Sequence, residues 1–167
     1  LTDGSEYTGD YKISDEELKS FHKKRLEIIL ETNPDILACE TIPSFKEAKI
    51  ICDLLKYYPN TSSWITFSAK DENYTNAGDD IKVCMTYFNK HEHISALGIN
   101  CTAPQYIPML IENIKSVSSK PIIAYPNGGS KYNPITKVWE KGELSPPEYA
   151  KLSHLWYTKG AKIIGGC

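Results

Sequence analysis

Apolar and polar positions alternate along this chain with two different periods, which predict helices and buried strands in turn. Apolar residues recur every three or four positions, as on one face of a helix, over residues 14–32, 44–55, 81–88, 107–114 and 145–160. Between these segments lie short apolar runs that are typical of strands buried on both faces: Ile36–Cys39, Trp64–Phe67, Ile94–Ile99, Pro121–Tyr125 and Ala161–Gly165. The runs begin about every 30 residues, the length of one strand–helix unit. We therefore expect an α/β protein built on a parallel sheet.

Three of the predicted helices begin with a capping box. In this motif a serine side chain accepts a hydrogen bond from the third helical residue, and a glutamate at that residue reaches back to the serine N–H. The pattern occurs as Ser14 with Glu17, Ser44 with Glu47, and Ser145 with Glu148. Two prolines in the first turn after Ser145 and a glycine at position 160 mark the start and the end of the last helix.

Two architectures share this rhythm, the doubly wound open sheet and the (β/α)8 barrel. The chain of 167 residues suffices for one core, so we interpret residues 1–167 as a single domain. The predicted units make up roughly five-eighths of a barrel of about 250 residues. A barrel therefore requires further strands before these, and without them the open sheet would be preferred. Because the chain opens without a methionine and stops directly after an apolar run, we expect both ends to be cut.

Composition excludes several classes of protein. Nineteen basic and 21 acidic residues are scattered along the chain, and the net charge of −2 offers no basic patch for nucleic acid. No apolar run approaches the roughly 20 residues of a membrane helix. Five cysteines at wide spacing do not resemble the set found in a disulfide-stapled secreted domain. We expect a cytoplasmic protein in a reducing setting, with neither nucleic acid nor membrane as a partner.

The polar residues of most interest directly follow the predicted strands, where the loops of a parallel α/β protein converge. They are Glu40, Lys70-Asp71, Asn100-Cys101, Pro126-Asn127 and Cys167. One side of the sheet thus collects a carboxylate and two thiols. Cys101 and Cys167 are candidate metal ligands because each lies just beyond the end of its strand. Packing is the competing interpretation, since two thiols 66 positions apart lack the short spacing of most zinc sites.

The remaining cysteines have a structural interpretation. Cys52 and Cys84 lie on apolar helix faces and Cys39 lies within a strand, so we expect all three to pack in the core. The connection between Asn127 and Ser145 has no strong helical or strand pattern and is a candidate lid or substrate loop. We assign no ligand role to the histidines, which fall on helices or in a polar connection: His22, His91, His93 and His154.

Ordered motifs along the whole chain identify a family. They are Asp3–Tyr7 with Gly9–Tyr11, then Cys39–Pro43, Gly98–Cys101, Tyr125–Asn127 and Gly165–Cys167. In this order they resemble the motifs of homocysteine S-methyltransferases, most closely the branch that uses S-methylmethionine or S-adenosylmethionine as methyl donor. The resemblance implies a (β/α)8 TIM barrel, of which this chain supplies about the last five strands.

The resemblance also implies a zinc ion, Zn²⁺, held by one cysteine after the sixth barrel strand and two adjacent cysteines after the eighth. Carried over, the first is Cys101 and the second is Cys167, and the third would be the residue after Cys167. The implied reaction transfers a methyl group from the sulfonium donor to the homocysteine thiol and yields methionine, without a protein acid or base. Glu40 resembles the carboxylate that binds the ammonium group of homocysteine. Further residues expected around the substrate are Asn100, Tyr125 and Asn127.

Two other classes of function remain open. One is a non-catalytic α/β module that binds a small amino acid without a metal, or an inactive fragment of the enzyme. The other is a hydrolase on an open sheet, which lacks support because the sequence contains neither a Gly-x-Ser-x-Gly elbow nor a P-loop. Zinc content of the whole protein would separate the methyltransferase from the metal-free module.

Overall fold

The expected parallel sheet is present, and its strands follow one another in chain order. The computed structural model describes residues 4–129, 132–133, 136, 138–139 and 144–167. Five parallel strands lie in the order β1 (Leu37–Ile42), β2 (Ser63–Phe67), β3 (Ile94–Asn100), β4 (Ile122–Tyr125) and β7 (Ala161–Ile164). A doubly wound sheet reverses its order at a switch point, whereas a barrel keeps chain order. The fold is therefore part of a barrel and not an open doubly wound sheet.

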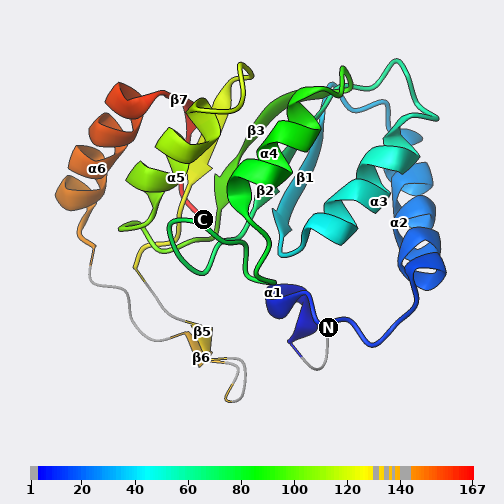
Figure 1. Ribbon diagram of the computed structural model, residues 1–167, viewed down its shortest axis with the longest axis horizontal. Coiled ribbons are helices and arrows are strands. Elements are labelled where there is room, and N and C mark those ends of the chain that lie inside the picture. The colour runs from blue at the N-terminus through cyan, green and yellow to red at the C-terminus, as the bar shows by residue number, and fades with distance from the viewer. Residues whose placement is uncertain (1–3, 130–131, 134–135, 137, 140–143) are drawn as a thin grey trace.

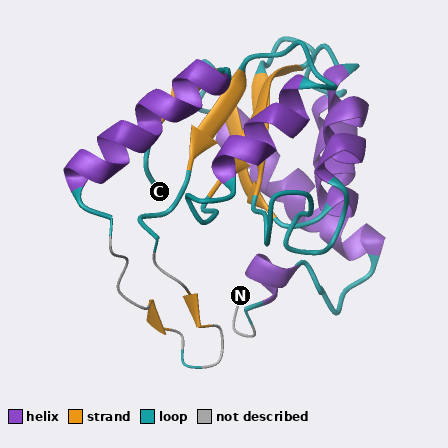
Figure 2. Ribbon diagram, turned by 60° about the vertical axis from the view of Figure 1, so that its left-hand side comes forward, coloured by secondary structure: helices purple, strands orange, loops and turns teal. Residues whose placement is uncertain are grey.

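Helices connect the strands and lie in a row along the sheet (Figures 1 and 2). They are the short α1 (Ser5–Thr8), α2 (Asp15–Leu30), α3 (Phe45–Leu55), α4 (Ile81–Asn89), α5 (Ile107–Lys115) and α6 (Pro146–Lys159). α3 packs on β1, α4 and α5 pack on β3, and α6 packs on β7. Figure 1 shows α2 outside α3 at one flank of the molecule and α6 at the other.

The predicted caps form at all three serines, with one difference. At Ser14 and Ser145 both hydrogen bonds of the capping box are present. At Ser44 the side chain accepts a hydrogen bond from the Glu47 N–H at 3.2 Å, but the Glu47 carboxylate binds other partners. The expectation of a complete box at Ser44 is therefore wrong in its second half, because tertiary contacts compete for the glutamate.

The core lies between the helices and the strands. Phe67, Phe88 and Trp156 are fully buried there. Cys52 and Cys84 are also buried, as their helix positions predict. β3 and β4 approach so closely that a Cβ added at Gly98 would lie 2.1 Å from the Ile123 carbonyl oxygen, which explains the glycine in the middle of a buried strand.

The connection after β4 contains structure that its sequence did not predict. β5 (Tyr132–Asn133) and β6 (Val138–Trp139) pair as a small antiparallel ribbon. The rest of the proposed lid, residues 130–131, 134–135, 137 and 140–143, lies outside the described residues. Within the described ranges, the structure has no helix with the length and apolar character needed to cross a membrane.

Candidate functional site

A cavity of about 670 Å³ lies where β1 and β3 end and where α1 and α2 approach them. Figure 1 shows α1 on the side of the sheet where β7 ends and the C-terminus lies. Glu40 and Thr41 at the end of β1 line the cavity together with Cys101 and Cys167. The sequence predicted Glu40, Cys101 and Cys167 at one side of the sheet. The fold brings these three residues into the lining of a single cavity.

The end of β4 determines how Cys101 and Cys167 meet. β4 lies between β3 and β7, so each cysteine follows a strand that flanks it. The Cys101 N–H donates to the Tyr125 carbonyl oxygen at 3.2 Å, and the Cys167 N–H donates to the Pro126 carbonyl oxygen at 3.1 Å. As a result the two Cα atoms are 5.6 Å apart although 66 positions separate them in the chain.

Cys101 and Cys167 are joined as a disulfide in this structure, whereas the sequence predicted two thiols. A Cα separation of 5.6 Å suits a disulfide, and sulfur atoms placed this close can also share one metal ion once they are reduced. Among the described residues, His, Cys, Asp and Glu form no group of three that could hold a metal. The chain therefore offers two soft sulfur ligands here, which fit part of a thiolate zinc site.

The other three cysteines differ chemically from this pair. Burial raises the pKa of Cys39 and of Cys84 to about 12, and that of Cys52 to about 11. A thiol with such a pKa stays protonated at neutral pH and is a poor metal ligand. Cys52 and Cys84 are buried in the core as expected, whereas Cys39 is partly buried, packs against the core and also lines the cavity.

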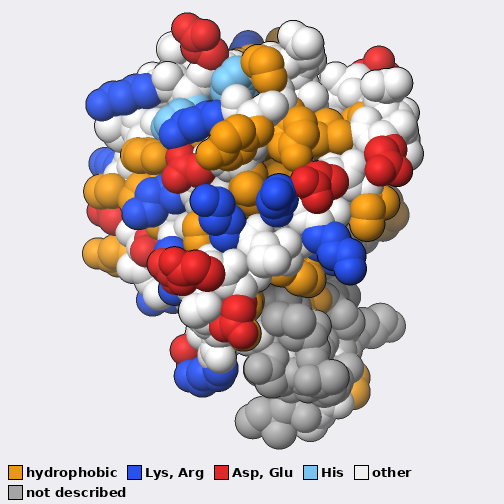
Figure 3. All heavy atoms as spheres, turned by 90° about the vertical axis from the view of Figure 1, so that its right-hand side faces the viewer, with side chains coloured by type: hydrophobic (Ala, Val, Ile, Leu, Met, Phe, Trp, Pro, Cys, Tyr) orange, Lys and Arg blue, Asp and Glu red, His pale blue; other side chains and the backbone are white. Residues whose placement is uncertain are grey.

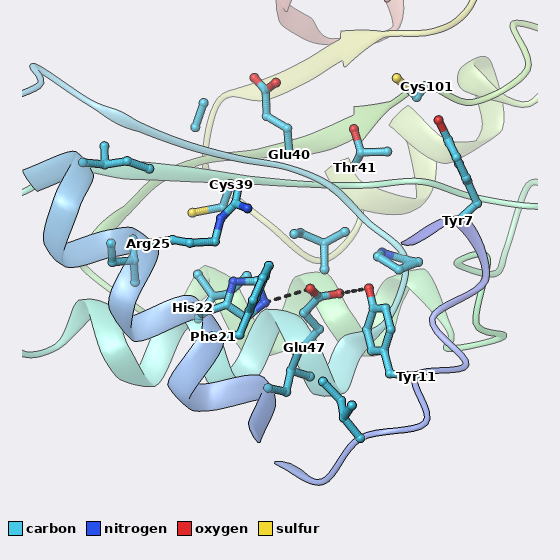
Figure 4. A pocket seen from close by; sticks show the side chains of 18 of the residues that line it. Tyr7, Tyr11, Phe21, His22, Arg25, Cys39, Glu40, Thr41, Glu47 and Cys101 are labelled. Carbon is cyan, nitrogen blue, oxygen red and sulfur yellow. Dashed lines mark hydrogen bonds and ion pairs between the residues drawn. The ribbon is translucent and has the colours of Figure 1, made fainter. Parts of the chain in front are cut away.

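Glu40, the predicted ammonium-binding carboxylate, lies within β1 and not after it, because the strand continues to Ile42 instead of ending at Cys39. Its side chain is exposed, and its Oε1 accepts a hydrogen bond from Trp64 Nε1 at 3.3 Å. Successive strand residues point to opposite faces. Figure 4 shows Cys39 directed toward Arg25 of α2 and Glu40 directed the other way. The carboxylate is therefore accessible on the face of β1 that is turned away from α2.

The other three predicted substrate contacts lie in different surroundings. Asn100 is 1% exposed and is not among the described residues that line the cavity. Tyr125 is partly buried, its hydroxyl lies 3.2 Å from Thr66 Oγ1, and burial together with the nearby Glu40 raises its pKa well above the usual range. Asn127 accepts a hydrogen bond from the Gly129 N–H at 3.0 Å, which closes the turn after β4. These geometries bring Asn100 and Tyr125 close to Glu40 and leave Asn127 in a local turn.

Several residues of the cavity escaped the sequence analysis. Tyr7 of α1 lines it, and Glu47 accepts hydrogen bonds from Tyr11 at 2.6 Å and from His22 at 2.8 Å (Figure 4). The sequence analysis predicts only a capping role for Glu47 and no ligand role for His22. No local pattern connects positions that meet only when α2, α3 and the segment before α2 pack together. The Asp3–Tyr7 motif was the one available signal for Tyr7.

Comparisons with known proteins agree with this arrangement. The family model described as Homocysteine S-methyltransferase matches residues 1–167. The chain is 49% identical over its full length to Homocysteine S-methyltransferase YbgG of Bacillus subtilis, covering 53% of that protein, and 34% identical to Homocysteine S-methyltransferase of Escherichia coli, covering 54%.

Solved structures of the E. coli homocysteine methyltransferase MmuM match in both fold and sequence. The metallated form superposes with a TM-score of 0.84 at 32% identity, covering all of this chain and 52% of that one. The oxidized form superposes with a TM-score of 0.82. The chain thus spans about half the length of these relatives. Because the family model matches every residue of the chain, the chain belongs to the homocysteine S-methyltransferase family.

Proposed function

We propose that this chain forms the metal- and acceptor-binding part of a zinc-dependent homocysteine S-methyltransferase. The observation that carries the proposal is that Cys101, Cys167 and Glu40 line one cavity. Homocysteine has a thiol at one end and an ammonium group at the other. The two cysteines suit a site for the thiol, and the exposed carboxylate suits the ammonium group. The methyl donor is a sulfonium compound, either S-methylmethionine or S-adenosylmethionine.

Cys101 and Cys167 would hold zinc as thiolates, after two equivalents of a cellular thiol reduce the disulfide to two thiols and are themselves oxidised to a disulfide. The reducing cytoplasm is the compartment that keeps such ligands available. We expect a further ligand from outside the described residues, because these contain no third candidate at the site. Bound zinc supplies deprotonation of the acceptor thiol, whose pKa of roughly 8.5 would otherwise leave little thiolate at neutral pH.

Glu40 orients the acceptor and takes no part in proton transfer. In the reaction the acceptor sulfur forms a new S–CH3 bond as the donor C–S bond breaks, and the electron pair of that bond stays on the donor sulfur as a neutral thioether. No acid is needed for such a leaving group. The contribution of the chain is therefore alignment of the reacting atoms, which requires the acceptor to be held at both ends.

The test uses the full barrel, meaning this chain together with the strand–helix units that would close it. We expect methionine to form from homocysteine and S-methylmethionine or S-adenosylmethionine after reduction and zinc loading. Cys101→Ser should abolish zinc retention and methionine formation while the circular dichroism spectrum stays native. Zinc is measured by plasma emission spectroscopy.

Cys84→Ser is the matched control, because Cys84 is equally a cysteine but is buried on α4 away from the cavity. It should leave zinc content unchanged and lower the free energy of unfolding by about 1 kcal/mol. If Cys101→Ser retained full zinc, the metal assignment would be wrong. Binding of homocysteine without zinc and without turnover would instead support the metal-free amino-acid-binding module.

A further inference from the structure

We infer that Asn100 is a positioning residue that sets the Glu40 carboxylate relative to Cys101, and that it does not itself contact the substrate. This inference rests on the proposed function and concerns the same site. Its starting point is the backbone at the ends of β1 and β3. Among the described residues, non-glycine residues with positive φ are Asn33, Thr41 and Cys101. Thr41 directly follows Glu40, and Cys101 directly follows Asn100.

Thr41 adopts a conformation that its side chain disfavours. Its φ of 58° lies in the left-handed region, where a β-branched residue is a genuine outlier. Such a backbone persists only when its surroundings impose it. β1 is also irregular here, since its register with β2 shifts between Cys39 and Ile42. Glu40 and Thr41 lie inside this irregularity, so the direction of the carboxylate depends on what holds the turn.

Asn100 supplies the contacts that hold Thr41. Its Oδ1 accepts a hydrogen bond from the Thr41 N–H at 2.8 Å, and its Nδ2 donates to Thr41 Oγ1 at 2.6 Å. The same Oδ1 accepts a hydrogen bond from Thr66 Oγ1 at 2.7 Å, which fixes the amide between β1 and β2. One buried side chain thus binds both the backbone and the hydroxyl of the residue after Glu40.

Hydrogen bonds also fix the backbone of Asn100 next to Cys101. The Asn100 carbonyl oxygen accepts a hydrogen bond from Thr102 Oγ1 at 2.9 Å, and the same hydroxyl accepts from the Ala69 N–H at 2.9 Å. Cys101, which lies between Asn100 and Thr102 in the chain, has a φ of 44°. Asn100 therefore connects two left-handed turns, one that carries Glu40 and one that carries a proposed metal ligand.

This geometry assigns Asn100 a role different from a substrate contact. It is 1% exposed, and its amide groups are occupied by Thr41 and Thr66. A residue placed in this way affects affinity for homocysteine only through Glu40. Asn100 thereby fixes the distance between the Glu40 carboxylate and the Cys101 sulfur, which would bind opposite ends of homocysteine. In-line methyl transfer requires such a fixed alignment of the acceptor.

A double-mutant cycle in the zinc-loaded full barrel tests the role. Glu40→Gln should raise the KM for homocysteine more than it lowers kcat, because an ammonium contact stabilises the ground state and the transition state alike. Asn100→Ala should raise the same KM about tenfold with zinc content unchanged. The double variant should be no worse than Glu40→Gln alone, because Asn100 acts through that carboxylate.

Matched variants separate positioning from general loss of structure. Asn113→Ala removes another buried asparagine, whose Nδ2 donates to the Glu72 carbonyl oxygen at 2.8 Å outside the cavity, so it should lower stability and leave KM unchanged. If Asn100→Ala fails to fold, Thr41→Val replaces it, since it removes only the hydroxyl contact. Thr41→Val should raise KM, and Thr41→Ser should recover most of the lost affinity.

Three outcomes would overturn the inference. Multiplicative effects of Asn100→Ala and Glu40→Gln would show a direct contact with homocysteine, and loss of zinc in Asn100→Ala would show a role in the metal site. Amide hydrogen exchange gives a readout that does not need turnover: Thr41 should lose protection in Asn100→Ala, and unchanged protection would refute the anchoring. Failure of the proposed function is distinct, because the unsubstituted, reduced protein would then neither retain zinc nor form methionine.

Discussion

The centre of the sheet and its two flanks differ in how completely this chain buries them. In β3 every residue except Ser95 is buried, and β3 has hydrogen-bonded neighbours on both sides. In β7 Lys162 and Ile163 are exposed, and within the described part of the chain β1 and β7 each pair on one side only. An unpaired strand leaves backbone N–H and C=O groups open to another strand. The difference indicates that the free edges of β1 and β7 are suited to pair with further strands, as in a closed barrel.

The helices repeat the same contrast. α5 buries Ile107, Leu110, Ile111 and Ile114 almost completely between its neighbours. The apolar positions of α2 include Leu18, Phe21 and Ile28, yet only Leu18 of these three is buried. Phe21, Ile28 and Ile29 are 47%, 58% and 42% exposed, and Figure 3 shows hydrophobic side chains among charged ones on this side. α2 is also much richer in charged residues than α5, so its sequence as well as its place at the flank leaves these apolar side chains exposed.

The largest expected effect concerns the chain of 167 residues by itself. Because β1 and β7 each have an edge that no other described strand pairs with, and α2 exposes apolar side chains, we expect the chain to associate, to bind zinc poorly and to transfer no methyl group. Light scattering and the methionine assay measure these properties against the full barrel. A monodisperse, active chain would contradict our interpretation of the flanks.

A smaller effect is expected in the centre, where Gly98→Ala should destabilise the fold. A Cβ at this position would lie 2.1 Å from the Ile123 carbonyl oxygen, so β3 and β4 would have to separate. Overpacking of this kind costs about 1–3 kcal/mol or more. Urea denaturation of the full barrel measures the loss.

Gly128→Ala is the control for this substitution, because a Cβ at Gly128 meets nothing within 4 Å. It should change the free energy of unfolding by less than about 0.5 kcal/mol. Equal effects of the two substitutions would mean that the contact between β3 and β4 is not what makes Gly98 necessary.

The smallest effect is expected at the flank, where Tyr11 donates a hydrogen bond to Glu47 at 2.6 Å. Tyr11→Phe removes this bond to a buried carboxylate that His22 also contacts, and should cost about 1 kcal/mol. Tyr57→Phe is the control, because Tyr57 is 74% exposed on the surface. If both substitutions were neutral in urea denaturation, the contact would contribute nothing to the flank.

Local chemistry explains why much of this fold could be predicted. The apolar periods placed every strand of the parallel sheet within a few residues, because burial on both faces leaves a continuous apolar run. The capping boxes at Ser14 and Ser145 form as expected, since both partners lie within one helical turn. The family motifs and the cysteines after β3 and β7 were likewise visible in the sequence.

The sequence by itself thus determined the main helices, the five parallel strands and the family, although Glu40 and Asn100, predicted to follow strands, lie inside β1 and β3. Only the tertiary structure decided which residues meet. The 5.6 Å between the Cα atoms of Cys101 and Cys167 depends on β4 lying between two strands, and the Glu47 contacts depend on the packing of α2 against α3. The Asn100 amide reaches Thr41 across 59 positions of chain. Periodicity reports which face of an element is buried, whereas partners distant in sequence are selected by the geometry of the assembled sheet.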